Sequence, residues 1–331
     1  MSLYLGIDLG GTHIKTGIVT DRGKLLDTES SATPPGGSGA ELARAMRQLT
    51  NRLLERQELS LDDIESIGVG SPGIVDTQTD SVIFAGNLRF RHEPLGAEVS
   101  QVHDGKPVRL VNDGNAAAYG ESIVGSGRGA SSLVMITLGT GIGGGIIIDG
   151  HIITGYAYGG AELGHMVIDM DGRHCTCGRR GCFETYASAT GLILTTQDYM
   201  RNHPETIMWA LCGQSLGGVS GRTAFDAARE GDPGGEAVVS LYIHHLAVGL
   251  GNIVNSIEPE VLCLGGGVSR QGDFLLNPLR EAVYAELIPG TVEKTRIVQA
   301  SLGNDAGVIG AALSEVWTEH SSATVVQERG D

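Results

Sequence analysis

The chain has 331 residues, of which 41% are hydrophobic and 19% charged, as in an ordinary soluble globular enzyme, and this length suggests two domains. Its formal net charge of -16 argues against binding to nucleic acid or anionic membranes, which require clustered Lys and Arg. Residues 1–8 lack the basic start of a signal peptide, and no stretch approaches the roughly 18 apolar residues of a membrane span, so we expect a cytoplasmic protein.

The first predicted element is a β-hairpin. Apolar residues alternate from 3 to 7, Asp8-Leu-Gly10-Gly11-Thr12 forms the turn, and 14–19 runs back. Backbone amides of a Gly-Gly-Thr turn can approach phosphate oxygens because no Cβ intervenes, and Lys15 adds positive charge nearby. A strand rather than a helix follows the glycines, which excludes a Walker A loop.

A second copy of this hairpin is predicted in the other half of the chain. The apolar strand 133–138 leads into the turn Gly139-Thr140-Gly141, and the strand 143–148 follows. A lone Gly/Thr turn is weak evidence for phosphate binding, but the repeat strengthens it, because two such hairpins would clamp a polyphosphate from both sides. The repeat also predicts two related domains.

Between the two hairpins, an amphipathic helix is predicted with its apolar face on residues 42–53, followed by strands at 67–69 and 108–111. The second of these strands ends in Asn112-Asp113-Gly114-Asn115. Reactive groups are often presented where a strand ends and a helix begins, so we expect Asp113 to be the general base of a phosphoryl transfer. The alternative is that Asp113 caps the helix, a role that Asn115 could fill instead.

Four potential metal ligands follow within one short stretch: His165, Cys175, Cys177 and Cys182. A Cys₃His set is a closed tetrahedral ligand group for structural Zn²⁺. Glu162 and Glu184 bracket this set without being needed as ligands. Since the second imidazole nitrogen of a zinc-bound His must donate, His165 between two carboxylates would grip a polyhydroxylated molecule. The alternative is a cluster of free thiols.

The remainder of the chain predicts α/β layering. We expect helices at 192–200, 224–229 and 237–257, the last interrupted by Gly249 and Gly251. After them we expect a strand at 261–264, the Gly265-Gly266-Gly267 loop, a helix at 274–286, a strand at 296–299, a helix at 305–316 and a polar tail.

In combination and in order, these motifs resemble the ROK family, which comprises bacterial repressors, open reading frames of unassigned role and sugar kinases. The resemblance extends from about residue 3 to residue 315. It rests on Asp8-x-Gly-Gly-Thr12-x-x-Lys15, Ser71-Pro72-Gly73, Asn112-Asp113-x-Asn115-Ala, Gly139-Thr140-Gly141-x-Gly143-Gly144, Glu162-x-x-His165 and Cys175-x-Cys177-Gly-x-x-Gly-Cys182-x-Glu184.

The resemblance implies an α/β, actin-like ATPase (ribonuclease H-like) fold of two domains with a cleft between them, closing over MgATP and a sugar. We expect residues 1–114 plus 305–318 to form the smaller domain, 115–304 the larger domain with the zinc site, and 319–331 a polar tail. We also expect a homodimer or homotetramer.

The resemblance further implies roles for individual residues. Asp113 would be the catalytic base toward a primary sugar hydroxyl, and a structural zinc ion would hold His165 and Glu184 in place. Sugar-binding residues would be Pro72, Gly73, Asn87, Asn112, Asp113, Glu162, His165 and Glu184. Nucleotide contacts would come from Asp8, Gly10, Gly11, Thr12, Lys15, Thr140, Gly141, Gly265, Gly266 and Gly267. Phe90 stands where many members that act on glucose carry Trp.

The expected activity is ATP-dependent phosphorylation of the 6-hydroxyl of a hexose, with glucose first. The alternatives are an N-acetylmannosamine, N-acetylglucosamine or fructose kinase, or a polyphosphate-dependent enzyme. A sugar-sensing repressor is disfavoured because the first hairpin begins at Leu3, which leaves no room for a DNA-binding segment. A filament-forming or chaperone ATPase would not need the Glu/His/Glu sugar grip.

Overall fold

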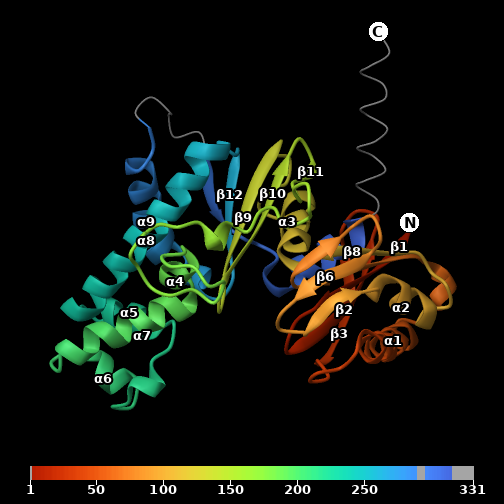
Figure 1. The fold of residues 1–331 in the computed structure, drawn as a ribbon, viewed down its shortest axis with the longest axis horizontal. Coiled ribbons are helices and arrows are strands. Elements are labelled where there is room, and N and C mark those ends of the chain that lie inside the picture. Colours follow the sequence, from red (N-terminus) through yellow and green to blue (C-terminus); the bar gives the residue numbers. More distant parts are fainter. Residues whose placement is uncertain (1, 289–294, 315–331) are drawn as a thin grey trace, which may run out of the picture. The chain divides into compact units, whose positions relative to one another are not determined.

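The computed structural model describes residues 2–288 and 295–314, so the predicted tail at 319–331 lies outside the described residues (Figure 1). The described chain divides into two compact units. Unit 1 holds residues 2–135, 145–161 and 301–314, and unit 2 holds residues 136–144, 162–288 and 295–300. The boundaries between the two units fall within two strands. The domain boundaries expected from the sequence stay a prediction.

Unit 1 is built on a five-stranded sheet in the order β3-β2-β1-β4-β8. The predicted first hairpin is confirmed, because the first two strands pair antiparallel with Asp8 opposite Lys15. The first, fourth and eighth strands run parallel to one another. The strands are β1 (Leu3–Leu9), β2 (His13–Thr20), β3 (Leu25–Ala32), β4 (Ile64–Ser71) and β8 (Val108–Asn112).

A smaller sheet of unit 1 contains β5 (Ile74–Asp76), β6 (Ser81–Ala85) and β7 (Phe90–Glu93). Phe90 is 3% exposed and belongs to the hydrophobic core of the unit. At this position the aromatic side chain therefore packs the interior.

Helices cover both faces of the five-stranded sheet. On one face, α1 (Gly39–Arg56) and α2 (Leu95–Val102) pack against each other and against the buried side chains of β1 and β4. Ser38 and Glu41 start α1 with a capping box. On the other face, the helix at 306–314 contacts the sheet so closely that a Cβ at Gly6 would lie 1.9 Å from the Val308 carbonyl oxygen. This helix therefore completes the core that the first strands begin.

The second five-stranded sheet repeats the strand order of the first, as β11-β10-β9-β12-β13. Strands β9 and β10 form the second predicted hairpin, and strands β12 and β13 run parallel. The internal repeat expected from the sequence is thus confirmed in the topology. The strands are β9 (Ser132–Leu138), β10 (Ile142–Ile148), β11 (His151–Ile152), β12 (Val261–Gly265) and β13 (Arg296–Gln299).

The remaining elements are helices and short 3₁₀ turns (Figure 1). Unit 1 also contains α3 (Asp113–Ile123), η1 (Leu61–Asp63) and η5 (Gly303–Asp305). Unit 2 contains α4 (Glu184–Ala187), α5 (Ala189–Asn202), α6 (Met208–Leu211), α7 (Thr223–Arg229), α8 (Pro233–Ile257), α9 (Asp273–Ala285), η2 (Leu163–His165), η3 (Leu216–Gly218) and η4 (Val268–Gln271).

Helix α8 corrects two expectations. It runs unbroken through Gly249 and Gly251. The role of Gly249 is to leave room for a close neighbour, since a Cβ at this position would lie 2.2 Å from the Phe183 ring. Its length and a mean hydropathy of 1.6 also suffice for a membrane span, contrary to the expectation that no stretch comes near one. Because 61% of that window is buried, α8 is the core helix of unit 2.

Replacing Gly249 by Ala should destabilise the protein by about 1–3 kcal/mol, because the added methyl group overpacks the Phe183 ring. Denaturant unfolding measures the change. Asn252→Ala, on the exposed face of the same helix, serves as the control and should change stability little. Equal stability of Gly249→Ala and the wild type would show that the close contact is not needed.

Candidate active site

In unit 1, the first hairpin turn is held by Thr33. The Thr33 hydroxyl donates to the Gly10 carbonyl at 2.7 Å, and the Thr33 backbone N–H donates to the Thr12 carbonyl at 2.8 Å. In a planar trans peptide, the N–H of the next residue points opposite to the carbonyl. The Gly11 N–H is therefore directed away from Thr33, and Gly11 and Thr12 are exposed. This arrangement suits a phosphate-binding turn.

The charged residues of this hairpin lie next to η5 and the helix at 306–314. The Lys15 ammonium forms an ion pair with Asp305 and donates to the Asn304 carbonyl at 3.3 Å. Burial raises the pKa of Asp8, and the nearby Lys15 partly offsets this rise. Asp8 also lies at the N-terminus of that helix, 3.0 Å from where a Cβ of Gly307 would be, where the helix dipole favours a negative charge.

Asp113 is exposed at the first position of α3, directly after β8. The helix is capped by Asn112, whose side-chain oxygen accepts from the Asn115 N–H at 3.1 Å. The expectation that Asn115 provides the cap is therefore wrong, because the cap residue must precede the helix. Asp113 instead accepts from the Gly114 N–H at 2.8 Å, which fixes its carboxylate.

The predicted sugar residues of unit 1 lie close to these elements. The Asn112 amide donates to the Gly73 carbonyl at 3.0 Å, next to the buried Pro72, so the ends of β4 and β8 are joined. Asn87 lies beside the first hairpin turn, since a Cβ at Gly11 would be 3.1 Å from its amide nitrogen. The structure therefore brings Asn87 next to a predicted nucleotide residue.

In unit 2, two predicted nucleotide segments meet at the end of β9. The turn after this strand contains Gly139, whose N–H donates to the Gly141 carbonyl at 3.0 Å, and the exposed Thr140. Gly266, in the loop after β12, has a φ of +85° and packs against the backbone of Leu138. Gly266 and Gly267 are exposed beside this turn, whereas Gly265 is buried.

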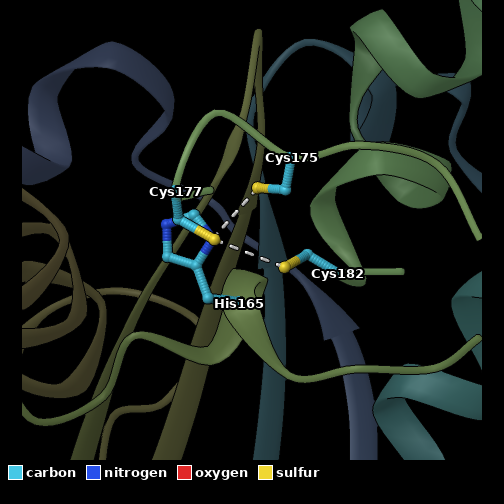
Figure 2. A group of neighbouring side chains, drawn as sticks. All are labelled: His165, Cys175, Cys177 and Cys182. Carbon is cyan, nitrogen blue, oxygen red and sulfur yellow. Dashed lines mark hydrogen bonds between the residues drawn. The ribbon is translucent and has the colours of Figure 1, made fainter. Parts of the chain in front are cut away.

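The four predicted metal ligands come together, with all ligand atoms within 4.8 Å of one another (Figure 2). His165 Nδ1 lies 3.5 Å from Cys175 Sγ, and Cys177 Sγ lies 3.6 Å from Cys182 Sγ. Zinc bonds of about 2.3 Å to sulfur and about 2.0 Å to nitrogen would place tetrahedral ligand atoms about 3.5–3.8 Å apart. The donor set and its spacing therefore fit a bound metal ion.

The thiols of this cluster differ in their ease of ionisation. A hydrogen bond from the Arg179 backbone N–H lowers the pKa of Cys177, whereas burial raises the pKa of Cys182 to about 12. A buried thiolate at Cys182 therefore requires a cation beside it. Because His165 Nδ1 faces the sulfur atoms, Nε2 is the ring nitrogen available as an outward donor.

The two predicted carboxylates flank the cluster differently. Glu162 is exposed, and its carbonyl accepts from the His165 N–H at 3.0 Å across η2. Glu184, at the start of α4, is half-buried: one oxygen accepts from the Ile142 N–H at 2.9 Å, and the other lies 3.9 Å from Cys175 Sγ. Glu184 thus contacts both the metal site and the second hairpin turn.

Three residues of the site are missing from the sequence-based set: Thr33, Thr190 and Asp305. Thr190 donates to the Thr140 carbonyl at 2.7 Å, and Asp305 pairs with Lys15. These contacts span 50 and 290 positions of sequence, so no local pattern indicates them. For Thr190, the sequence offers one indication: Ser188 is a residue type that commonly precedes a helix, and it marks the start of α5.

Comparisons with known proteins show the family of this chain. The ROK family model matches residues 4–315. A glucokinase of Halalkalibacterium halodurans is 36% identical over 319 residues, covering 96% of each chain. A glucokinase of Thermotoga maritima is 35% identical over 309 residues, covering 93% of this chain and 95% of its own. The crystal structure of a ROK family glucokinase from Streptomyces griseus, in complex with glucose and AMPPNP, has a TM-score of 0.79 at 36% identity and covers 94% of this chain and 98% of its own.

Proposed function

Because this chain belongs to the ROK family, we propose that it is a glucokinase-like sugar kinase that transfers the terminal phosphoryl group of MgATP to the 6-hydroxyl of glucose. The α/β, actin-like two-domain fold expected from the sequence is confirmed by the likeness to ROK kinase structures. The observation that carries the proposal is the near full-length similarity to glucokinases together with the exposed Asp113 at the start of α3.

We assign Asp113 the role of general base. Its carboxylate is exposed and oriented by the Gly114 N–H, so it can accept the proton of the sugar 6-hydroxyl. General-base help of this kind contributes about 10²–10⁴-fold to the rate. The remaining catalytic contribution of a kinase is positioning and charge stabilisation around the phosphoryl group.

Each unit supplies its own proposed sugar contacts. In unit 1 these are Pro72, Gly73, Asn87 and Asn112, next to Asp113. In unit 2 they are Glu162, His165 and Glu184. With Nδ1 toward the metal, His165 would donate from Nε2, and the two carboxylates would accept from sugar hydroxyls. A zinc ion bound by His165, Cys175, Cys177 and Cys182 would keep this set in place.

Phosphate contacts are proposed for the two Gly/Thr turns, where MgATP supplies the transferred group. Residues 10–12 with Asp8 and Lys15 would serve in unit 1, and Thr140, Gly141 and the 265–267 loop would serve in unit 2. We further propose a cytoplasmic location, consistent with five free cysteines. We also propose that the protein is a homodimer or homotetramer.

An assay that detects the sugar phosphate product tests the proposal, because this product forms with either phosphoryl donor. Purified protein is offered glucose, mannose, fructose, N-acetylglucosamine and N-acetylmannosamine with ATP, and glucose with polyphosphate. We expect the highest kcat/KM for glucose with ATP. A preference for an N-acetyl hexosamine would assign the alternative kinase activity, and no turnover with any sugar under either donor would contradict a kinase.

A further inference from the structure

The start of α5 holds the second hairpin turn by two hydrogen bonds. The Ala189 N–H donates to the Gly139 carbonyl at 2.8 Å, and the Thr190 hydroxyl donates to the Thr140 carbonyl at 2.7 Å. The first N–H groups of a helix have no partner within the helix, so the Ala189 N–H is available for this contact. The carbonyls of two consecutive peptide groups are thereby fixed on the same element.

These contacts determine the direction of the turn amides. Since the peptide group is planar and trans, the N–H that shares a plane with the Gly139 carbonyl, that of Thr140, points away from α5. The same holds for the Gly141 N–H, which shares its plane with the Thr140 carbonyl. Without α5, a turn rich in glycine would sample other conformations. The two amides are therefore oriented in advance as a pair of donors, which suits an anion.

Glu184 holds the next peptide group of the turn. Its carboxylate accepts from the Ile142 N–H at 2.9 Å, and a Cβ at Gly141 would lie 2.2 Å from the same oxygen. Any larger residue at position 141 would displace the carboxylate from this position. The short segment that follows the metal ligand Cys182 thus contacts three successive peptide groups of the turn.

Unit 1 shows a related arrangement, in which the two carbonyls that are held are not consecutive. There the Thr33 hydroxyl and backbone N–H hold the carbonyls of Gly10 and Thr12. In both predicted phosphate turns, a threonine hydroxyl and a backbone amide therefore donate hydrogen bonds to two carbonyls of the turn.

We propose that Thr190, together with Ala189, is a positioning residue for nucleotide phosphate binding in unit 2. It acts by orienting the Thr140 and Gly141 amides toward the polyphosphate, without touching the ligand itself. The inference rests on the proposed function and extends it to α5, an element outside all the recognised motifs.

The test measures the affinities of Thr190→Val for ATP and for glucose by calorimetry. Loss of a hydrogen bond of this kind should weaken ATP binding about three- to tenfold, with glucose affinity unchanged. Thr190→Ser keeps the hydroxyl and should bind ATP as the wild type does. Thr196→Val is the matched control, because the Thr196 hydroxyl donates only to the Leu192 carbonyl of its own helix among the hydrogen bonds described.

The outcomes separate the inference from the proposed function. ATP affinity of Thr190→Val equal to that of the wild type would overturn the inference, as would an equal loss in Thr196→Val, which would indicate a general effect on the helix. Equal losses of ATP and glucose affinity would likewise indicate general loosening. If the wild type itself bound no ATP, the proposed function would fail, and the inference with it.

Discussion

Asp113→Asn is expected to lower kcat by about 10²–10⁴-fold while leaving glucose affinity largely unchanged. The amide has the shape of the carboxylate but cannot accept a proton from the sugar hydroxyl. Because Asp113 lies at the first position of α3 with its side chain exposed, the change leaves the hydrophobic core intact. Steady-state kinetics together with calorimetric titration of glucose separate the rate from the binding.

Asp273→Asn provides the matched control, because Asp273 is also exposed at the first position of a helix, α9. Both variants lose the same favourable interaction of a carboxylate with a helix N-terminus. Only the change at position 113 should affect kcat. A kcat of Asp113→Asn within about tenfold of the wild type would remove Asp113 from the role of base.

Cys177→Ser is expected to lose the bound metal and to lower sugar affinity by about 10- to 100-fold. Cys177 Sγ lies 3.6 Å from Cys182 Sγ, and Cys182 is only two residues before Glu184, so loosening of the cluster frees a proposed sugar contact. Since Glu184 and α5 also hold the second hairpin turn, ATP affinity should fall as well. Elemental analysis and calorimetry measure the three quantities.

The control for this variant is Cys212→Ser. Cys212 is buried and contacts the Trp209 carbonyl, outside the metal cluster, so one equivalent of zinc should remain. Wild-type protein purified without chelator and found to contain no zinc would refute the metal assignment. Retention of zinc by Cys177→Ser with full sugar affinity would refute the link between the cluster and the sugar.

Local patterns predict most of the fold. Both hairpins follow from alternating apolar residues around Gly/Thr turns, and the repeat of these hairpins predicts the repeated strand order. The Cys₃His cluster is predictable because its four residues lie within 18 positions, from 165 to 182, in a characteristic pattern of residue types. These features depend on residues that are close in sequence.

Features that depend on distant residues escape such patterns. The conformational freedom of Gly249 predicts a break in the helix, yet the role of this residue is set by the Phe183 ring 66 positions earlier. The pairing of Lys15 with Asp305 and the hydrogen bond from Thr190 to Thr140 likewise depend on tertiary structure. The residues that hold a site in place are therefore harder to predict than the residues at its surface.

The packing of the helix at 306–314 against β1 and β4 has a consequence for biosynthesis. A Cβ at Gly68 would lie 1.7 Å from the Ala311 carbonyl oxygen, so this face of the sheet is shaped for the helix. About 180 residues separate position 135, where the first segment of unit 1 ends, from position 314. At typical rates of about 5–20 residues per second, synthesis passes position 135 roughly 10–40 s before it completes this helix. During this interval, the apolar face of the first strands lacks the helix that covers it in the folded protein.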